Sequence, residues 1–253
     1  MSFKEISWLR REKYGGNKGP NFEADVLRLE KGEPLDHVIG YTDFLEAKIA
    51  VDEKVLIPRT ETEYWAGHVI RELSDFDSEH ATLSVLDLFS GSGCIGIALL
   101  NHLPQSFVTF ADKSPAAVEK IHENLSENAI PADRFRVLTS DVFEHIPEQF
   151  DVITANPPYI SKDAMETVEP SVLAYEPHDA LFAGDNGLAY LKKLLREAPN
   201  HLKSGGVLYT EFGRDQQEAL QTFIRKELPD AYDKTAFFKD QYGQPRFLRV
   251  SLA

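Results

Sequence analysis

The sequence predicts an α/β fold, with a seven-stranded sheet that is parallel except for a terminal antiparallel hairpin and that is covered by helices on both faces. Three observations lead to this prediction. From about residue 83, apolar runs of strand length alternate with amphipathic helical patterns. A glycine-rich turn follows the first of these runs. The last two runs follow one another without a helical pattern between them, so they pair most simply as a hairpin.

We expect two parts: a short N-terminal helical and hairpin region, residues 1–79, and a larger domain, residues 80–253. In the first part we predict helices over 3–13 and 21–31 and a small hairpin near 47–51. Thr60 then offers a helix cap, and Glu63 follows at the spacing of a capping box.

The larger domain carries the alternation. The predicted strands are 84–89, 107–111, 134–139, 151–155, 206–211, 234–238 and 246–252. The predicted helices are 93–103, 114–128, 187–202 and 214–227.

Composition narrows the class of protein. The chain has 253 residues, 42% of them hydrophobic and 27% charged, which argues against a wholly disordered chain. The formal net charge is −14. Because nucleic-acid binders gain much of their affinity by neutralising phosphates, this charge argues against a nucleic-acid substrate.

The chain shows no sign of a membrane segment or of export. No apolar stretch approaches the roughly 18 residues that a membrane helix needs, and we expect no membrane association. The first residues do not have the pattern of a secretory signal. A single cysteine, Cys94, excludes an internal disulfide and a multi-cysteine zinc site, and we expect no metal. The simplest location is the cytoplasm, with a mitochondrial one left open.

The glycine-rich turn has the chemistry of a nucleoside site. Gly91, Gly93 and Gly96 fit G-x-G-x-x-G between a predicted strand and a predicted helix. Asp112 ends the next strand 21 residues after Gly91, where an acid that binds ribose hydroxyls belongs. The alternative is a tight strand-to-helix turn followed by an ordinary loop acid.

Two cofactors compete for such a site, a dinucleotide and S-adenosylmethionine. Asp87, just before the glycines, could receive the amino-acid end of S-adenosylmethionine, stabilise the loop through backbone N–H groups, or do both. Asp141 could accept a hydrogen bond from adenine, with Val142 and Phe143 against the ring; alternatively, Asp141 is a helix N-cap.

The strand at 151–155 runs directly into the tetrad Asn156-Pro157-Pro158-Tyr159. The two prolines stiffen this segment and remove two N–H donors. The side-chain carbonyl of Asn156 and the main-chain carbonyl of Pro157 can together hold both hydrogens of a planar NH2 group, and Tyr159 offers a flat surface beside it. Two such acceptors orient the nitrogen lone pair and stabilise the positive charge that develops when it attacks an electrophile. The alternative is a rigid turn.

From about residue 34 to its end, the chain resembles the HemK/PrmC family, the glutamine methyltransferases of peptide-chain release factors. Beside the tetrad, the resemblance depends on PLDHVIG at 34–40, LIPRTETE at 56–63 and YEPHDALFAGDNG at 175–187. It implies a Rossmann-like class I methyltransferase fold, with S-adenosylmethionine as cofactor and the glutamine of a release factor Gly-Gly-Gln motif as substrate.

The resemblance also implies roles for particular residues. The methionine part of the cofactor would lie against Phe89, Ser90, Gly91, Ser92 and Gly93. Asp112 would bind ribose, and Asp141 and Val142 would lie at adenine. Asn156 through Tyr159 would bind the glutamine side chain, and Asn156 would also contact the cofactor. In this chain Phe89 stands where the family has its first loop glycine.

We expect a release factor as protein partner, no stable nucleic-acid binding, and a monomer. The nearest alternative is a DNA or RNA amino-methyltransferase, which uses a similar tetrad on base amines. A nicotinamide oxidoreductase and a binding module without turnover are further alternatives.

Some residues have both a structural and a functional interpretation. Arg59, Glu61 and Glu63 are either capping residues or part of the substrate mouth, and Glu211 is either an exposed strand end or a site residue.

Overall fold

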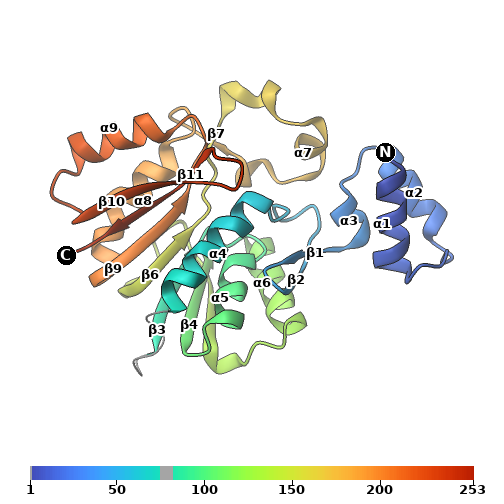
Figure 1. Cartoon of the computed structure of the whole chain (residues 1–253), viewed down its shortest axis with the longest axis horizontal. Coiled ribbons are helices and arrows are strands. Elements are labelled where there is room, and N and C mark those ends of the chain that lie inside the picture. The colour runs from blue at the N-terminus through green and yellow to red at the C-terminus, as the bar shows by residue number, and fades with distance from the viewer. Residues whose placement is uncertain (1, 75–81) are drawn as a thin grey trace.

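The computed structural model describes residues 2–74 and 82–253, and a twisted seven-stranded sheet lies at its centre (Figure 1). The strand order is β10-β11-β9-β6-β3-β4-β5. Its strands are β3 (Leu83–Leu88), β4 (Ser106–Asp112), β5 (Phe135–Thr139), β6 (Phe150–Ala155), β9 (Leu202–Glu211), β10 (Lys234–Lys239) and β11 (Pro245–Ser251).

The sheet has the predicted mixture of directions. β5, β4, β3, β6 and β9 are parallel to one another, whereas β11 is antiparallel to both β9 and β10. This confirms the α/β fold class and the terminal antiparallel hairpin. The chain extends the sheet from β3 to β4 and β5 and then returns to place β6 on the other side of β3. Such a reversal opens a crevice at the carboxyl ends of the two central strands.

Helices cover both faces of the sheet. On one face lie α4 (Thr60–Ser74), α5 (Cys94–His102) and α6 (Pro115–Glu127), and on the other α8 (Ala189–His201) and α9 (Gln217–Glu227). Alternate residues of β3 face opposite ways, so Val85 belongs to the first core and Leu86 to the second. Their apolar partners remove both faces of the central strands from water.

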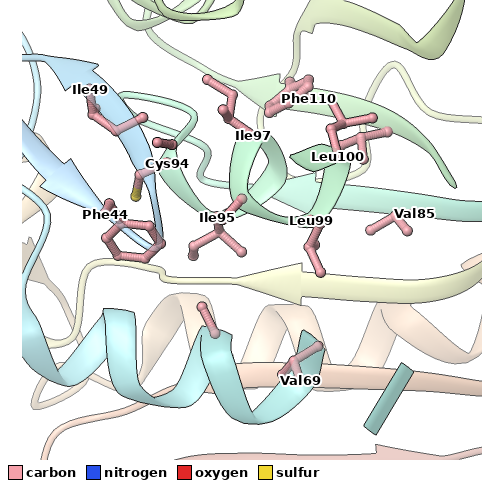
Figure 2. Close-up of a cluster of buried hydrophobic side chains, with 14 of the residues drawn as sticks. Phe44, Ile49, Val69, Val85, Cys94, Ile95, Ile97, Leu99, Leu100 and Phe110 are labelled. Atoms are coloured by element: carbon pink, nitrogen blue, oxygen red, sulfur yellow. The ribbon is translucent and has the colours of Figure 1, made fainter. Parts of the chain in front are cut away.

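A small hairpin, β1 (Tyr41–Phe44) and β2 (Ala47–Ala50), packs into the first core. Figure 2 shows its Phe44 and Ile49 beside Cys94 and Ile95 of α5. The predicted hairpin therefore exists, and together with α4 it shares a core with the sheet. The predicted boundary between residues 79 and 80 lies outside the described residues, and the division into 1–79 and 80–253 stays a prediction.

The first helices form a group of their own at one end of the molecule (Figure 1). α1 (Phe3–Tyr14) and α2 (Phe22–Glu30) confirm the predictions for 3–13 and 21–31, and the sequence did not predict α3 (Leu35–Ile39). Their small core consists of Leu9, Phe22, Leu29 and Val38. A capping box between Ser2 and Glu5 begins α1.

The predicted capping box at Thr60 is wrong. Thr60 is itself the first residue of α4, and the Glu63 carboxylate accepts the backbone N–H of Leu45 at 2.9 Å. Glu63 therefore fastens the turn of the hairpin to α4 instead of capping its own helix.

The segment after the tetrad contains short elements that periodicity did not predict. β7 (Ile160–Ser161) pairs in parallel with β8 (Phe182–Ala183). Between them lie η3 (Lys162–Thr167), α7 (Pro170–Tyr175) and η4 (His178–Ala180), and a further short helix, η2 (Ala132–Arg134), precedes β5. None of the helices within 2–74 and 82–253 has the length and apolar character needed to cross a membrane.

Candidate active site

The register of the sheet brings four strand ends together. Leu88 of β3 lies opposite Ala111 of β4 on one side and Ala155 of β6 on the other. Ala155 in turn lies opposite Thr210 of β9. The residues that follow these positions are Phe89, Asp112, Asn156 and Glu211. Parallel strands therefore place the glycine loop, two acids and the tetrad along one edge of the sheet.

Two of the cavities at this edge are lined by Asn156, and the larger of these two has a volume of about 470 Å³, within the range typical of small-molecule sites. One wall is the glycine loop, and another is the segment 54–59 that leads into α4. Six residues predicted to bind a cofactor line it: Phe89, Ser90, Gly91, Ser92, Asp112 and Asn156. Four others do not: Asp87, Gly93, Asp141 and Val142.

Asp112 is held at this cavity by backbone donors. Its Oδ2 accepts the N–H of Gly91 at 2.9 Å, and its Oδ1 accepts the N–H of Ser114 at 2.9 Å. Burial raises the pKa of Asp112, whereas these two hydrogen bonds oppose the rise. Each carboxylate oxygen has more than one lone pair, so both can also accept from a ligand hydroxyl group. This arrangement suits a ribose diol.

Asp87 lies below the loop, out of reach of the cavity. Its Oδ2 accepts the N–H of Gly96 at 3.1 Å, and its Oδ1 accepts the hydroxyl of Thr154 at 2.9 Å. The side chain is fully buried, and burial raises its pKa to about 7. Of the interpretations left open for Asp87, the structure shows the loop-stabilising one.

Asp141 and Val142 follow β5, one strand further from the tetrad. Thr139 pairs with Asp112, and the N–H of Ser140 reaches the Asp112 carbonyl, which brings Asp141 to the same edge of the sheet. Asp141 itself is exposed, with Lys193 at 3.7 Å. The ring of Phe143 stacks on His201 at 4.1 Å between centroids, so it faces α8 instead of the cavity.

Cys94 lines the larger cavity as a buried thiol, and burial raises its pKa to about 12. A thiol with this pKa stays neutral near pH 7 and is a poor nucleophile. Cys94 therefore serves as a small packing group, and it belongs to the first core.

The smaller cavity adjoins the larger one and measures about 290 Å³. Three residues line both: Leu56, Arg59 and Asn156. The remaining lining of the smaller cavity is mostly apolar and consists of Tyr159, Ile160, Thr167, Val168, Val172 and Leu181. Asn156 therefore stands between two neighbouring spaces, one beside the glycine loop and one beside the segment after the tetrad.

The tetrad is fixed by side chains from other elements. The Asn156 Nδ2 group donates to Thr62 Oγ1 at 3.3 Å, and the Tyr159 hydroxyl donates to Glu211 Oε1 at 2.8 Å. Within the described residues, no protein donor reaches Asn156 Oδ1 or the carbonyl of Pro157. Pro158 lines the larger cavity, whereas Pro157 is buried and lines neither.

Burial, together with the charge of Glu211, raises the pKa of Tyr159 well above its usual value, so its hydroxyl stays protonated and able to donate. Among the residues that the structure describes, the site thus offers Asn156 Oδ1 as an acceptor without a protein donor, close to a protonated tyrosine.

Several site residues were missed or left undecided by sequence reasoning. Glu211 is only 1% exposed, so its interpretation as an exposed strand end is wrong. Glu176, which pairs with Arg59, and Thr62 were not singled out, although both lie in segments that carry the family resemblance. Of the undecided acids, Glu63 binds the hairpin turn and Glu61 accepts from Thr60.

In the part of the chain that the structure describes, no group of three potential metal ligands is present.

The Methyltransferase small domain family model matches residues 72–175, which include the glycine loop and the tetrad. A release factor glutamine methyltransferase from Streptococcus pneumoniae is 35% identical over 251 residues, covering 99% of this chain and 86% of that protein.

Solved structures of low sequence identity share the fold. The hMettl16 catalytic domain, in complex with the MAT2A 3'UTR hairpin 6, aligns with a TM-score of 0.62 at 13% identity, covering 94% of this chain and 84% of that one. SMU.776 complexed with SAH aligns with a TM-score of 0.55 at 13% identity, covering 81% of this chain and 53% of that one. At these identities the comparison shows the fold alone, which is that of methyltransferases.

Proposed function

The chain belongs to the release factor glutamine methyltransferase family, and we propose that it methylates the side-chain amide nitrogen of the glutamine in a release factor Gly-Gly-Gln motif. Similarity to a relative of this name along nearly the whole chain supports this function. It does not favour the alternative, methylation of a DNA or RNA base amine. The methyl donor is S-adenosylmethionine, as for the methyltransferases that share the fold.

The larger cavity would hold S-adenosylmethionine. Asp112 would accept the ribose hydroxyls, and Asp141 and Val142 would lie toward adenine at the same strand edge. Phe89 through Gly93 would surround the methionine part, and Asp87 would act below them by holding the loop through Gly96. When bound, the cofactor supplies a methyl group as an electrophile on a positively charged sulfur.

The tetrad would prepare the glutamine amide for attack. An amide nitrogen is a poor nucleophile because its lone pair is delocalised into the carbonyl. Asn156 Oδ1 and the Pro157 carbonyl would accept its two hydrogens, turn the lone pair toward the larger cavity and stabilise the charge that forms on nitrogen. Tyr159, held by Glu211, would pack along the side chain, and Pro158 keeps the turn stiff. The nitrogen can release a proton to water after transfer.

One observation carries this proposal. Asn156 lines both cavities, and no protein donor among the described residues occupies its Oδ1 atom. This acceptor is thus available in a side chain that lines both the space for a cofactor and the space for an inserted amide. The apolar lining of the smaller cavity, including Leu56, Val172 and Leu181, suits the methylene groups of a glutamine.

The direct test is mass spectrometry of a release factor after incubation with the protein and isotopically labelled S-adenosylmethionine. We expect one methyl group, located on the glutamine of the Gly-Gly-Gln motif. The matched substrate has glutamate in that position and should gain none. A methyl group on a different peptide, or on RNA or DNA supplied in parallel, would contradict the proposed substrate.

The Asn156→Ala variant tests the site. It should bind S-adenosylmethionine about as well as the parent and lose roughly 100-fold or more in turnover, as other enzymes do when a group that stabilises transition-state charge is removed. An equal loss of cofactor affinity and turnover would count against the assigned role.

A further inference from the structure

Glu211 is a buried carboxylate with three hydrogen-bond donors. Its Oε2 accepts from the Thr62 hydroxyl at 2.6 Å and from the Trp65 indole Nε1 at 2.7 Å, both on α4. Its Oε1 accepts from the Tyr159 hydroxyl at 2.8 Å. Burial raises the pKa of Glu211, and these three donors and the nearby charge of Arg246 oppose that rise. The pattern of partners is that of an acceptor.

The direction of these hydrogen bonds is determined by the chemistry of the partners. An indole N–H can only donate, so Glu211 Oε2 must be an acceptor. The Thr62 hydroxyl has one hydrogen, and at 2.6 Å from Oε2 it donates that hydrogen to Glu211. Thr62 Oγ1 can therefore only accept from its other neighbour, Asn156, whose side-chain nitrogen lies 3.3 Å away.

This chain of contacts removes an ambiguity in Asn156. The oxygen and nitrogen of an asparagine amide have nearly the same shape, and a half-turn exchanges an acceptor for a donor. With Thr62 accepting, the NH2 group faces Thr62, and Oδ1 is the amide atom left without a donor among the described residues, in a side chain that lines both cavities. The reversed amide would present a donor to the substrate instead.

Building on the function proposed above, we propose that Thr62, oriented by Glu211, is a positioning residue that sets the direction of the Asn156 amide and thereby selects a glutamine amide over a glutamate carboxylate. Asn156 Oδ1 attracts the NH2 group of glutamine and repels the oxygens of a carboxylate. A reversed Asn156 would do the opposite. Thr62 touches neither reacting atom in this role and acts through Asn156.

The test compares Thr62→Val, which keeps the shape and removes the hydroxyl, with Thr62→Ser, which restores it. The main readout is the ratio of two affinities: the KM for the release factor, and the inhibition constant of the same release factor with glutamate replacing the Gly-Gly-Gln glutamine. In Thr62→Val we expect kcat to fall about tenfold and the preference for amide over carboxylate to fall at least about tenfold. Thr62→Ser should stay within about twofold of the parent for both.

Two further variants separate an effect on the direction of the Asn156 amide from a general loss of stability. Thr109→Val removes a buried threonine hydroxyl from β4, away from this chain of contacts, and should leave kcat and the preference unchanged. In Glu211→Gln, the Trp65 N–H should turn the new amide oxygen toward Trp65 and Thr62, so Thr62 keeps its acceptor. The preference for amide over carboxylate should then stay, although kcat should fall if Tyr159 is held less firmly. Thermal unfolding and cofactor binding of each variant show whether the fold is intact.

The outcomes are distinct. If the parent does not methylate the glutamine, the proposed function fails before any variant is considered. If the parent is active but Thr62→Val keeps the amide preference of the parent, or Thr62→Ser does not restore it, the inference about Thr62 is wrong. A loss of preference in Glu211→Gln as large as that in Thr62→Val would overturn the part assigned to Glu211.

Discussion

Arg59 and Glu176, 117 residues apart in the chain, form an ion pair with 2.7 Å between Nη2 and Oε1. The Glu176 side chain is 1% exposed, and its other oxygen accepts the N–H of Ile57 at 3.1 Å. Arg59 lines both cavities. The pair therefore ties the segment before α4 to the segment after the tetrad, and both segments form cavity walls.

Removal of this pair should affect both stability and substrate binding. Arg59→Ala leaves the buried Glu176 carboxylate with the Ile57 N–H as its one donor among the described residues, so we expect a loss of about 1–3 kcal/mol in the free energy of unfolding. The KM for the release factor should rise because a wall of the smaller cavity loosens. Chemical denaturation and steady-state kinetics measure the two effects.

Arg136→Ala is the control: its pair with Glu148 has the same 2.7 Å length, but both side chains are 43% exposed. It should cost no more than about 1 kcal/mol and leave KM unchanged.

The two acids at the edge of the larger cavity should differ in their contribution to cofactor affinity. Asp112→Ala removes acceptors that backbone donors hold in place at the cavity, so we expect S-adenosylmethionine to bind at least about tenfold more weakly. Asp141→Ala should cost less, because Asp141 is exposed and lies outside the cavity lining. Titration calorimetry with the cofactor alone measures both. If Asp141→Ala weakened cofactor binding more than Asp112→Ala, the larger role assigned to Asp112 would be wrong.

Asp87 should make stability depend on pH in an unusual direction. Burial raises its pKa to about 7, against about 4 in the unfolded chain. Between these values the folded state holds a proton that the unfolded state has released. The contribution of Asp87 to stability is therefore fully present below about pH 4 and is lost as the pH rises through about 7.

The measurement compares the parent with Asp87→Asn, which cannot ionise. The free energy of unfolding of the parent, minus that of the variant, should fall by about 1–3 kcal/mol between about pH 5 and about pH 8. Asp215→Asn, at a side chain that is 90% exposed, should give a difference that hardly changes with pH. A difference for Asp87 that rises with pH would refute the assigned direction.

Gly96 allows α5 to approach β4 closely. A Cβ atom at this position would lie 2.2 Å from Cε1 of the buried Phe110 ring. Gly96→Ala should therefore destabilise the fold by about 1–3 kcal/mol, although alanine favours helix by up to about 1 kcal/mol. Gly67→Ala in α4 is the matched control, since its Cβ would meet Leu45 at an ordinary 3.4 Å. It should be neutral or stabilising, and thermal unfolding distinguishes the two helical glycines.

The sequence predicted the elements whose signal is local. Every strand of the main sheet and the helices around it appear within a few residues of their predicted ranges, because hydrophobic periodicity follows directly from strand and helix geometry. The signal failed where elements are short or where a side chain has a distant partner. β7 and β8 have two residues each, too few for a period, and Glu63 binds the turn of the hairpin instead of its own helix.

By itself the sequence determined the fold class, the glycine loop, the tetrad and the family, because each depends on residues that are close together in the chain. Only the tertiary structure decided that Asp87 lies below the loop. It also decided that Glu211 accepts from Thr62, 149 residues away, and that Thr62 accepts from Asn156. Such pairs depend on which strands are neighbours and on their register. Glu211, at the end of β9, is buried and receives its hydrogen bonds from Thr62 and Trp65 only when the strands and α4 pack together.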